Sequence, residues 1–163
     1  MVVAARRRAP KCPALSNPPD LRDELQRSGI SDPTPAQTAD AVIAIRRGKL
    51  PDPAVVANVG SFFKNPVVDD KLALDLQARF PQLKQFPVEQ GSKLSAAQLI
   101  DQAGWKERGT SELGVWQQQP LVLVNHGTSS GASVLAFAAE IAEDVYQRYQ
   151  VQLEIEPDLI GFD

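Results

Sequence analysis

Apolar residues recur at helical spacing in several stretches of this chain, and short apolar runs separate these stretches. The longest helix is predicted over residues 131–149, where one face carries an apolar stripe: Val134, Ala138, Ile141, Val145 and Tyr149. Shorter helices are predicted where a capping residue precedes an apolar pattern that glycine or proline ends: Asp20 to Ser28, Thr34 to Lys49, Asp69 to Pro81 and Ser95 to Gly104. Their expected core positions are Leu21 and Leu25, then Ala39, Val42 and Ile43, then Leu72, Leu76 and Phe80, and last Leu99 and Ile100.

Extended segments are predicted between these helices. The apolar run from Leu121 to Val124 is typical of a buried strand, and residues 59–63 and 66–68 are expected to form shorter ones. From Gln150 onward apolar and polar residues alternate, as in a half-buried strand. Residues 86–93 are expected to be a turn-rich link, and residues 105–119 to be irregular. Because helices and short strands mix without a regular alternation, the sequence predicts an α+β fold.

The composition is that of an ordinary globular protein, with 163 residues, 43% of them hydrophobic and 23% charged. This length suits one domain, or one domain and a piece of another. A net charge of -3 gives no reason to expect nucleic-acid binding. One cysteine and one histidine cannot form a Cys/His metal cluster, and no apolar run approaches the ~20 residues of a membrane-spanning helix. We therefore expect a soluble, cytoplasmic protein.

The first twenty residues differ from the rest of the chain. They contain several prolines and a group of basic residues: Arg6, Arg7, Arg8 and Lys11. A transit peptide has a similar charge, but the prolines would break the amphipathic helix that such a peptide needs. We therefore expect residues 1–20 to form a disordered or aberrant N-terminal extension.

The stretch from Lys49 to Asn65 combines residue types that a purely structural loop does not need. It contains two prolines that stop a helix, and Gly60, which permits a sharp turn or a close approach to a ligand. Ser61 follows this glycine directly, and Lys64 lies three residues further on. The combination indicates a site that presents a hydroxyl group on a tight turn, beside groups that bind anionic oxygens.

The alternating segment after Gln150 places two carboxylates on the same face, Glu154 and Glu156. The simple interpretation is a solvated edge of a strand. The functional interpretation is that one of the two points into a site, and the pattern itself does not say which.

Four groups of residues occur here in the order in which they occur in one family of bacterial flavoenzymes. They are Lys49-Leu50-Pro51-Asp52-Pro53 with Gly60-Ser61-Phe62-Phe63-Lys64-Asn65-Pro66, then Leu99-Ile100-Asp101-Gln102-Ala103-Gly104-Trp105-Lys106, then Gln119-Pro120-Leu121-Val122-Leu123-Val124-Asn125, and last Leu153-Glu154-Ile155-Glu156. Residues 21–161 thereby resemble the UDP-N-acetylenolpyruvoylglucosamine reductases, also called UDP-N-acetylmuramate dehydrogenases, of peptidoglycan precursor synthesis.

The resemblance implies that the chain corresponds to the C-terminal part of these longer enzymes. Residues 21–50 would be a remnant of the family's second, flavin-side domain, and residues 51–150 would be the substrate-binding domain. Residues 151–163 would be a C-terminal strand that returns to the flavin domain, which has no counterpart in this chain.

The resemblance also implies a reaction in two halves. NADPH reduces FAD, and the flavin then passes hydride to the enolpyruvyl group of UDP-N-acetylglucosamine enolpyruvate, which yields UDP-N-acetylmuramate after protonation. This chain would supply the substrate-binding part and the proton donor, with a separate flavin-binding chain as a possible partner. No partnership with nucleic acid or membrane is implied.

The matched motifs assign roles to individual residues. Ser61 corresponds to the serine that delivers the proton, and the alignment chooses Glu156 over Glu154 as the glutamate that assists at the developing enol. The positions that bind the substrate's diphosphate, sugar or uridine are matched by Lys49, Asn65, Lys106, Gln119 and Arg46.

Two other functions are compatible with the same residues. The chain could be a non-catalytic module that binds a UDP-sugar, because lysines suit phosphate and an amide can pair with the edge of uracil. It could also be an inactive truncated fragment that lacks the FAD domain.

Overall fold

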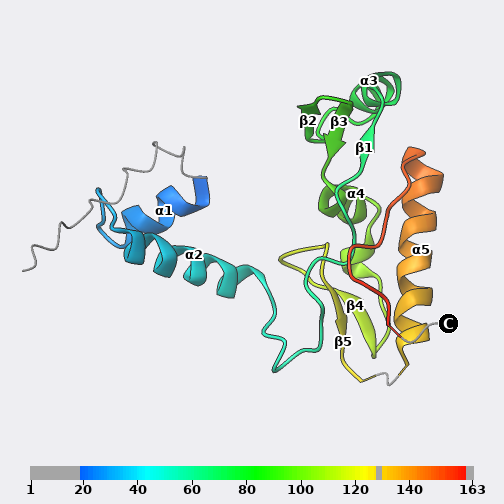
Figure 1. Ribbon diagram of the computed structural model, residues 1–163. Helices are drawn as coiled ribbons and strands as arrows, with labels where there is room; N and C mark the ends of the chain where they lie inside the picture. Colours follow the sequence, from blue (N-terminus) through cyan, green and yellow to red (C-terminus); the bar gives the residue numbers. More distant parts are fainter. Residues whose placement is uncertain (1–18, 128–129, 161–163) are drawn as a thin grey trace, which may run out of the picture. The chain divides into compact units, whose positions relative to one another are not determined.

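The computed structural model describes residues 19–127 and 130–160 and divides the chain into two units, Met1–Gly48 and Lys49–Asp163 (Figure 1). The predicted N-terminal extension lies outside the described residues, apart from its last two positions. Each unit has its own apolar cluster.

The first unit contains two helices, α1 (Pro19–Arg27) and α2 (Pro35–Lys49), apart from the last residue of α2, which is the first of the second unit. The predicted start of α2 is confirmed in detail by a reciprocal capping box. The Gln37 amide donates to Thr34 Oγ1 (3.3 Å), and the Thr34 amide donates to Gln37 Oε1 (2.9 Å). Pro35 occupies the first helical position, where its missing N–H costs nothing.

The predicted apolar face of α2 is wrong. The cluster of this unit is formed by Leu21, Leu25 and Ala41, with Ile30 and Ile45 packed against it. Ala39 is exposed, and Val42 and Ile43 are 40% and 45% exposed. Apolar spacing shows that a stripe exists, but α1 covers the neighbouring face of the helix, which sequence periodicity alone does not reveal.

The second unit mixes short antiparallel sheets with helices, which confirms the predicted α+β fold. Its elements are β1 (Val67–Val68), α3 (Asp70–Arg79), β2 (Gln85–Val88), β3 (Gly91–Leu94), α4 (Ala96–Gln102), the 3₁₀ helix η1 (Trp105–Glu107), β4 (Leu113–Val115), β5 (Leu123–Asn125) and α5 (Gly131–Tyr149). One sheet has the strand order β1-β3-β2, and β4 pairs with β5 in a second.

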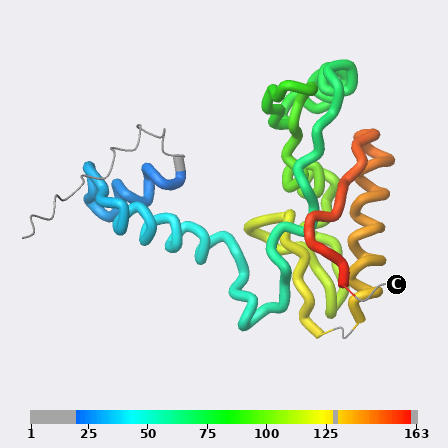
Figure 2. The backbone as a smooth tube through the Cα atoms, viewed as in Figure 1, coloured from blue at the N-terminus to red at the C-terminus, as the bar shows by residue number. Residues whose placement is uncertain are grey.

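Side-chain caps start the helices of this unit at the predicted positions. Asp69 Oδ1 accepts from the Leu72 amide (2.8 Å), and Ser95 Oγ accepts from the Gln98 amide (3.3 Å). At the other end of α5, Gln150 adopts a left-handed conformation (φ 57°) and its amide donates to the Tyr146 carbonyl (2.8 Å). This residue ends the helix, and the chain then reverses direction (Figure 2).

Two predicted irregular regions contain strands instead. Residues 86–93 belong to a hairpin in which Val88 pairs with Gly91 and β3 continues the pairing to β1. Within residues 105–119, η1 and β4 are regular, and β4 pairs with β5 in the register Gly114 to Val124. Both regions lack apolar alternation, and their strands are defined by pairing with distant segments rather than by local pattern.

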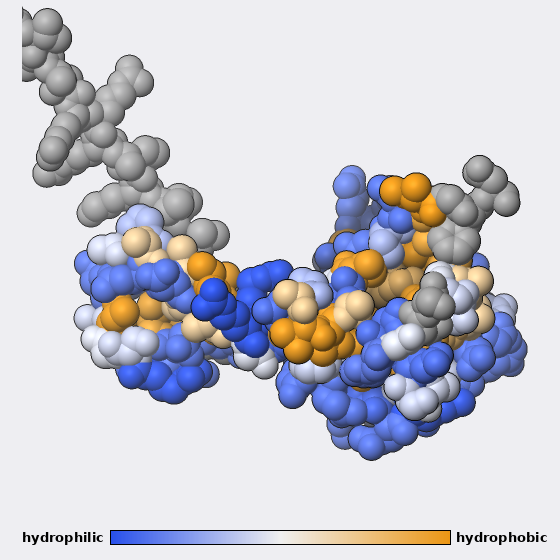
Figure 3. Space-filling view, turned by 90° about the horizontal axis from the view of Figure 1, so that it is seen from below, coloured by the Kyte–Doolittle hydropathy of each residue, from blue (hydrophilic) through white to orange (hydrophobic). Residues whose placement is uncertain are grey.

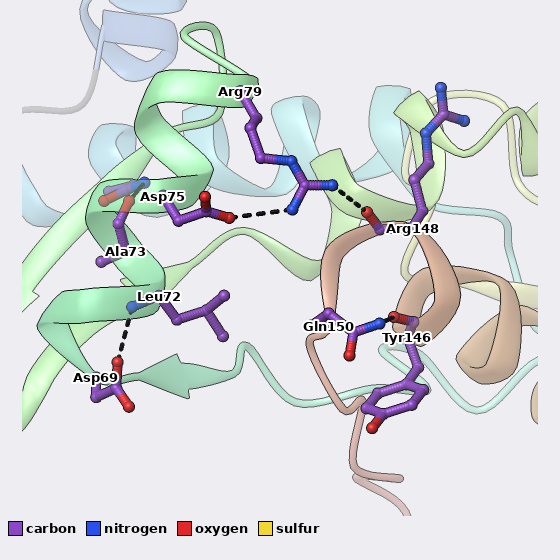
Figure 4. Close-up of polar contacts among 9 residues, drawn as sticks. Asp69, Leu72, Ala73, Asp75, Arg79, Tyr146, Arg148 and Gln150 are labelled. Atoms are coloured by element: carbon purple, nitrogen blue, oxygen red, sulfur yellow. Dashed lines mark hydrogen bonds and ion pairs between the residues drawn. The ribbon is translucent and has the colours of Figure 1, made fainter.

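The core of the second unit gathers around α5, whose predicted stripe is confirmed. Its buried residues are Phe137, Ala138, Ile141, Val145 and Tyr149. The Phe80 ring meets the Tyr149 ring edge-on at 4.8 Å between centroids. Arg79 pairs with Asp75 (3.0 Å) and donates to the Arg148 carbonyl (3.3 Å), which ties α3 to the end of α5 (Figure 4).

The described residues include no helix that is long and apolar enough to cross a membrane. They also bring together no group of three or more His, Cys, Asp or Glu side chains that could hold a metal ion.

Gly91 generates the first testable prediction. Its φ is 127°, and a Cβ atom at this position would lie 2.2 Å from the Val68 carbonyl oxygen of the paired strand. We expect Gly91→Ala to lower the free energy of unfolding by about 2 kcal/mol or more, measured by urea denaturation.

Gly114→Ala is the matched control, because its Cβ would meet only Val124 Cγ2, at 3.7 Å. We expect this variant to change stability by less than about 1 kcal/mol. Equal effects of the two substitutions would contradict the assigned pairing of β1 with β3.

Candidate functional site

A tight turn presents Ser61 at the surface. The Asn58 side chain holds this turn, with Oδ1 accepting from the Gly60 amide (3.0 Å) and Nδ2 donating to the Val56 carbonyl (2.8 Å). Gly60 has a φ of 77°. Ser61 itself is exposed, whereas the next two residues, Phe62 and Phe63, are only 4% and 1% exposed. The two rings therefore anchor the segment in the core while the hydroxyl group stays outside.

The Ser61 segment lies between two other extended segments. On one side, Ser61 forms an antiparallel bridge with Val122, and the Phe62 amide donates to the Leu121 carbonyl (2.8 Å). On the other side, Phe63 forms an antiparallel bridge with Ile155. Isolated bridges therefore replace the continuous strands predicted for residues 59–63 and after Gln150.

The bridge to Ile155 brings Glu156 beside the Ser61 segment. The Glu156 amide donates to the Phe62 carbonyl (3.0 Å), and the Lys64 amide donates to the Glu154 carbonyl (2.9 Å). Ser61 thus directly precedes Phe62, the residue whose carbonyl accepts the hydrogen bond from the Glu156 amide. The structure brings the predicted proton donor and the predicted glutamate onto neighbouring segments, although 95 positions apart along the chain (61 and 156).

Glu154 and Glu156 differ in their partners. The carboxylate of Glu154 forms an ion pair with Lys64. That of Glu156 is exposed and accepts no hydrogen bond from the residues that the structure describes. Of these two carboxylates, Glu154 is the one engaged in an ion pair among the described residues.

Lys64 is surrounded by acidic residues. The hydrogen bond that the Lys64 ammonium group donates to Glu154 raises the pKa of Lys64, and the charge of Glu154 adds to this effect. Desolvation opposes it, and the charges of Glu156 and Asp158 make the smaller remaining contributions that raise the pKa. Its role could not be assigned from the sequence. The sequence features that could have pointed to this role are a lysine three residues after Ser61 and three acidic residues at alternate positions of the last segment: Glu154, Glu156 and Asp158.

Asn65 has a structural contact. Its Oδ1 accepts from the Ala96 amide (2.9 Å), at the first residue of α4. Ala96 is fully buried, so this acceptor satisfies an amide that water does not reach. The nitrogen of the same side-chain amide remains available as a donor to a ligand.

Three further predicted residues are connected to the turn of residues 116–122, which leads into the Val122 bridge. The Trp116 indole donates to the Lys49 carbonyl (3.0 Å). Gln119 lies in the turn, and its carbonyl accepts from the Val122 amide (2.9 Å). The Lys106 carbonyl accepts from the Gln117 side chain (2.6 Å). The backbones of Lys49, Lys106 and Gln119 are thus all hydrogen-bonded to or within residues 116–122, and Val122 of this turn also pairs with Ser61.

The Lys106 ammonium group pairs with Asp101 of α4 at 2.8 Å. A cavity of about 280 Å³ is lined by this aspartate together with Lys84, Ser95, Ala97, Gln98 and Pro120. Arg46 belongs to α2 of the first unit, whereas the other candidate residues belong to the second unit.

The surface that precedes Ser61 is apolar. Val55 and Val59 are 81% and 63% exposed. Val59 also lines a cavity of about 200 Å³, together with Ala57, Asn58, Phe62, Leu123, Val124, Asn125 and Val134. Figure 3 shows apolar side chains among polar ones on the surface. An exposed hydroxyl beside apolar surface suits a site that a ligand or another part of the protein covers.

Comparison with known proteins gives a consistent result. A family model described as "UDP-N-acetylenolpyruvoylglucosamine reductase, C-terminal domain" matches residues 52–160. A protein named UDP-N-acetylenolpyruvoylglucosamine reductase from Xanthomonas euvesicatoria is 51% identical over 143 residues, which is 86% of this chain and 41% of that protein. One of the same name from Pseudomonas aeruginosa is 50% identical over 140 residues, or 85% and 41%. The chain therefore spans about two fifths of the length of these relatives.

The contact between Asn65 and Ala96 can be tested by two substitutions. Asn65→Ala leaves the Ala96 amide without a partner, and we expect it to lower the free energy of unfolding by about 1–2 kcal/mol. Asn65→Asp keeps the acceptor and places a negative charge at a helix N-terminus, so we expect stability close to that of the unmodified chain. Equal destabilisation by both variants, measured by urea denaturation, would contradict the capping role.

The ion pair of Lys64 can be tested by NMR titration of its side chain. Because Glu154 is the largest cause of the raised pKa of Lys64, we expect Glu154→Gln to lower this pKa toward 10.5. The pair contributes stability fully below pH 10.5 and loses it as the pH rises through the higher folded value. Asp75→Asn, which breaks the ion pair with Arg79, should leave the Lys64 titration unchanged.

Proposed function

The chain belongs to the UDP-N-acetylenolpyruvoylglucosamine reductase family, and from this premise we propose that it supplies the substrate-binding part and the proton donor of such a reductase. The reaction would convert UDP-N-acetylglucosamine enolpyruvate to UDP-N-acetylmuramate in peptidoglycan precursor synthesis. The observation that carries this proposal is the placement of Ser61 and Glu156 on adjacent segments, within the motifs that match the family.

Ser61 is proposed as the proton donor. A serine hydroxyl is a weak acid, but a carbanion-like centre is basic enough to take its proton when the geometry is held. The Asn58 turn and the two buried rings that follow Ser61 supply such rigidity. Glu156 is proposed to assist at the developing enol; its residue is exposed, and its backbone amide is bonded to the Phe62 carbonyl of the Ser61 segment.

The substrate would be bound by side chains around the 116–122 turn. Lys49 and Lys106 are proposed to bind the diphosphate as compact positive charges. Asn65 and Gln119 have amide groups that could bind the sugar or the uracil edge. Arg46 is proposed as a further contact to the nucleotide. Lys106 already pairs with Asp101, so phosphate would have to compete with this carboxylate.

FAD and NADPH are proposed as the cofactor and reductant by family alone. FAD would supply the hydride when bound. The cavity beside the Ser61 turn is about 200 Å³ and contains neither Ser61 nor Glu156. We therefore place flavin binding in another part of the protein, or in a separate chain.

The same proposal assigns the remaining segments. Residues 21–50 would be the remnant of the flavin-side domain, residues 51–150 the substrate-binding domain, and residues 151–163 the segment that returns to the flavin domain. The exposed Val42 and Ile43 of α2 support the first assignment, because they would be buried by a further domain. The alternatives are a non-catalytic UDP-sugar-binding module and an inactive fragment.

Calorimetric titration with UDP-N-acetylglucosamine tests the binding half of the proposal. We expect Lys106→Ala to weaken binding about tenfold or more, because a charge-assisted contact to phosphate is lost. Asp101→Asn breaks the same ion pair but keeps the lysine, so it should bind as tightly as the unmodified chain or more tightly. Absence of binding to the unmodified chain would contradict both the substrate-binding role and the binding module.

The visible spectrum of the chain after incubation with FAD and removal of free cofactor tests the flavin assignment. We expect no retained flavin absorbance. Retained absorbance would overturn the placement of the flavin site elsewhere, and oxidation of NADPH with the enolpyruvyl substrate would then be measured directly.

A further inference from the structure

We infer that Lys64 is a positioning residue for Glu156: its ion pair with Glu154 holds the last segment against the Ser61 segment, so that Glu156 stays beside the serine. The assignment of a role to Glu156 rests on the proposed function, whereas the geometry of the contact does not.

Lys64 has a firmly held backbone. The residue before it, Phe63, is 1% exposed in the core. The residue after it, Asn65, is fixed by its hydrogen bond to the Ala96 amide (2.9 Å). The Lys64 side chain therefore extends from a rigid position into solvent, with half of its side-chain surface exposed.

The segment that carries Glu156 lies at the edge of the core, where Ile155 is partly buried and packed against the apolar cluster. Val151 and Leu153 are buried, but Glu156 is exposed, and Leu159 and Ile160 are 49% and 89% exposed. Its backbone is joined to the Ser61 segment by the two hydrogen bonds that flank the Ile155 bridge. Burial thus ends just before the residue that is proposed to act, and the Lys64–Glu154 pair lies at that boundary.

Charge gives Lys64 a second effect on the same residue. Glu154, Glu156 and Asp158 stand at alternate positions of this segment, and each interacts electrostatically with the Lys64 ammonium group. Like charges so spaced repel one another, and a cation among them lowers that repulsion. Lys64 therefore both ties the segment through Glu154 and offsets the charge around Glu156.

Amide hydrogen exchange of the full chain, measured by NMR, tests the inference without any ligand. We expect Lys64→Met to raise the exchange rate of the Glu156 amide about twofold to fivefold, the range for an exposed ion pair. Amides of β5 and α5 should be unchanged. Lys64→Arg keeps the charge and should restore slow exchange, and so should the double charge reversal Lys64→Glu with Glu154→Lys.

Lys71→Met is the matched control, because Lys71 is an exposed lysine of α3 with no acidic contact among the described residues. It should leave Glu156 exchange unchanged. Glu154→Gln removes the other partner of the ion pair and should also raise the exchange rate of the Glu156 amide. It provides a second test if Lys64→Met folds poorly. An unchanged Glu156 exchange rate in both pair-breaking variants would overturn the inference.

Salt and activity separate this inference from the proposed function. Because the pair is exposed, 1 M salt should speed Glu156 exchange in the unmodified chain but hardly in Lys64→Met. Where reductase activity is measurable, Lys64→Met should lower kcat with little change in KM, since Lys64 acts through Glu156 rather than on the substrate. Faster exchange without any reductase activity would support the contact and contradict only the function; a raised KM with unchanged kcat would overturn the positioning role.

Discussion

The burial of Phe62 and Phe63 is the constraint on which the site depends. Both rings belong to the same apolar cluster as the inner face of α5, and they meet edge-to-face at 5.5 Å. With two adjacent residues fixed in the core, the backbone of the segment has little freedom. Ser61 and Lys64, which flank the two rings, are consequently displayed at fixed positions on the surface. The rigidity of the site comes from apolar packing, and the polar side chains proposed to act lie at the edge of the apolar cluster.

This separation of support and chemistry extends across the second unit. The residues that the structure describes include no buried polar or charged residue, and every candidate site side chain is exposed or only partly buried. What positions these side chains is backbone hydrogen bonding: Phe62 to Leu121 on one side and Glu156 to Phe62 on the other. Folding of the chain therefore removes few polar groups of the site from water, and these groups stay available to a ligand or another surface that covers them.

Local signals in the sequence were sufficient to predict where the α-helices occur, but not the buried face of α2 or the geometry of the site. The caps at Asp69 and Ser95 and the stripe of α5 are encoded within a few residues, and they could be predicted. The hairpin at 85–94 and the bridge between Phe63 and Ile155 depend on segments far apart in sequence, and no local pattern specifies them. The role of Lys64 belongs to the second class. The family resemblance pointed to Ser61 and Glu156, but the bridge between Phe63 and Ile155 is what brings Lys64 next to the segment that carries Glu156.

The two units differ in how far they can support themselves. The second has a cluster that extends from Phe62 to Leu153, large enough for an independent core. In the first, Leu21, Leu25 and Ala41 are the buried core of two short helices, while Val42 and Ile43 remain exposed. Isolated helices of this length are marginal in water, and so few apolar contacts do not offset their conformational entropy. Among the described residues, the apolar cluster of the first unit is thus much smaller than that of the second. Because Ser61, Lys64 and Glu156 all belong to the second unit, the framework of the candidate site is built on the larger of the two clusters.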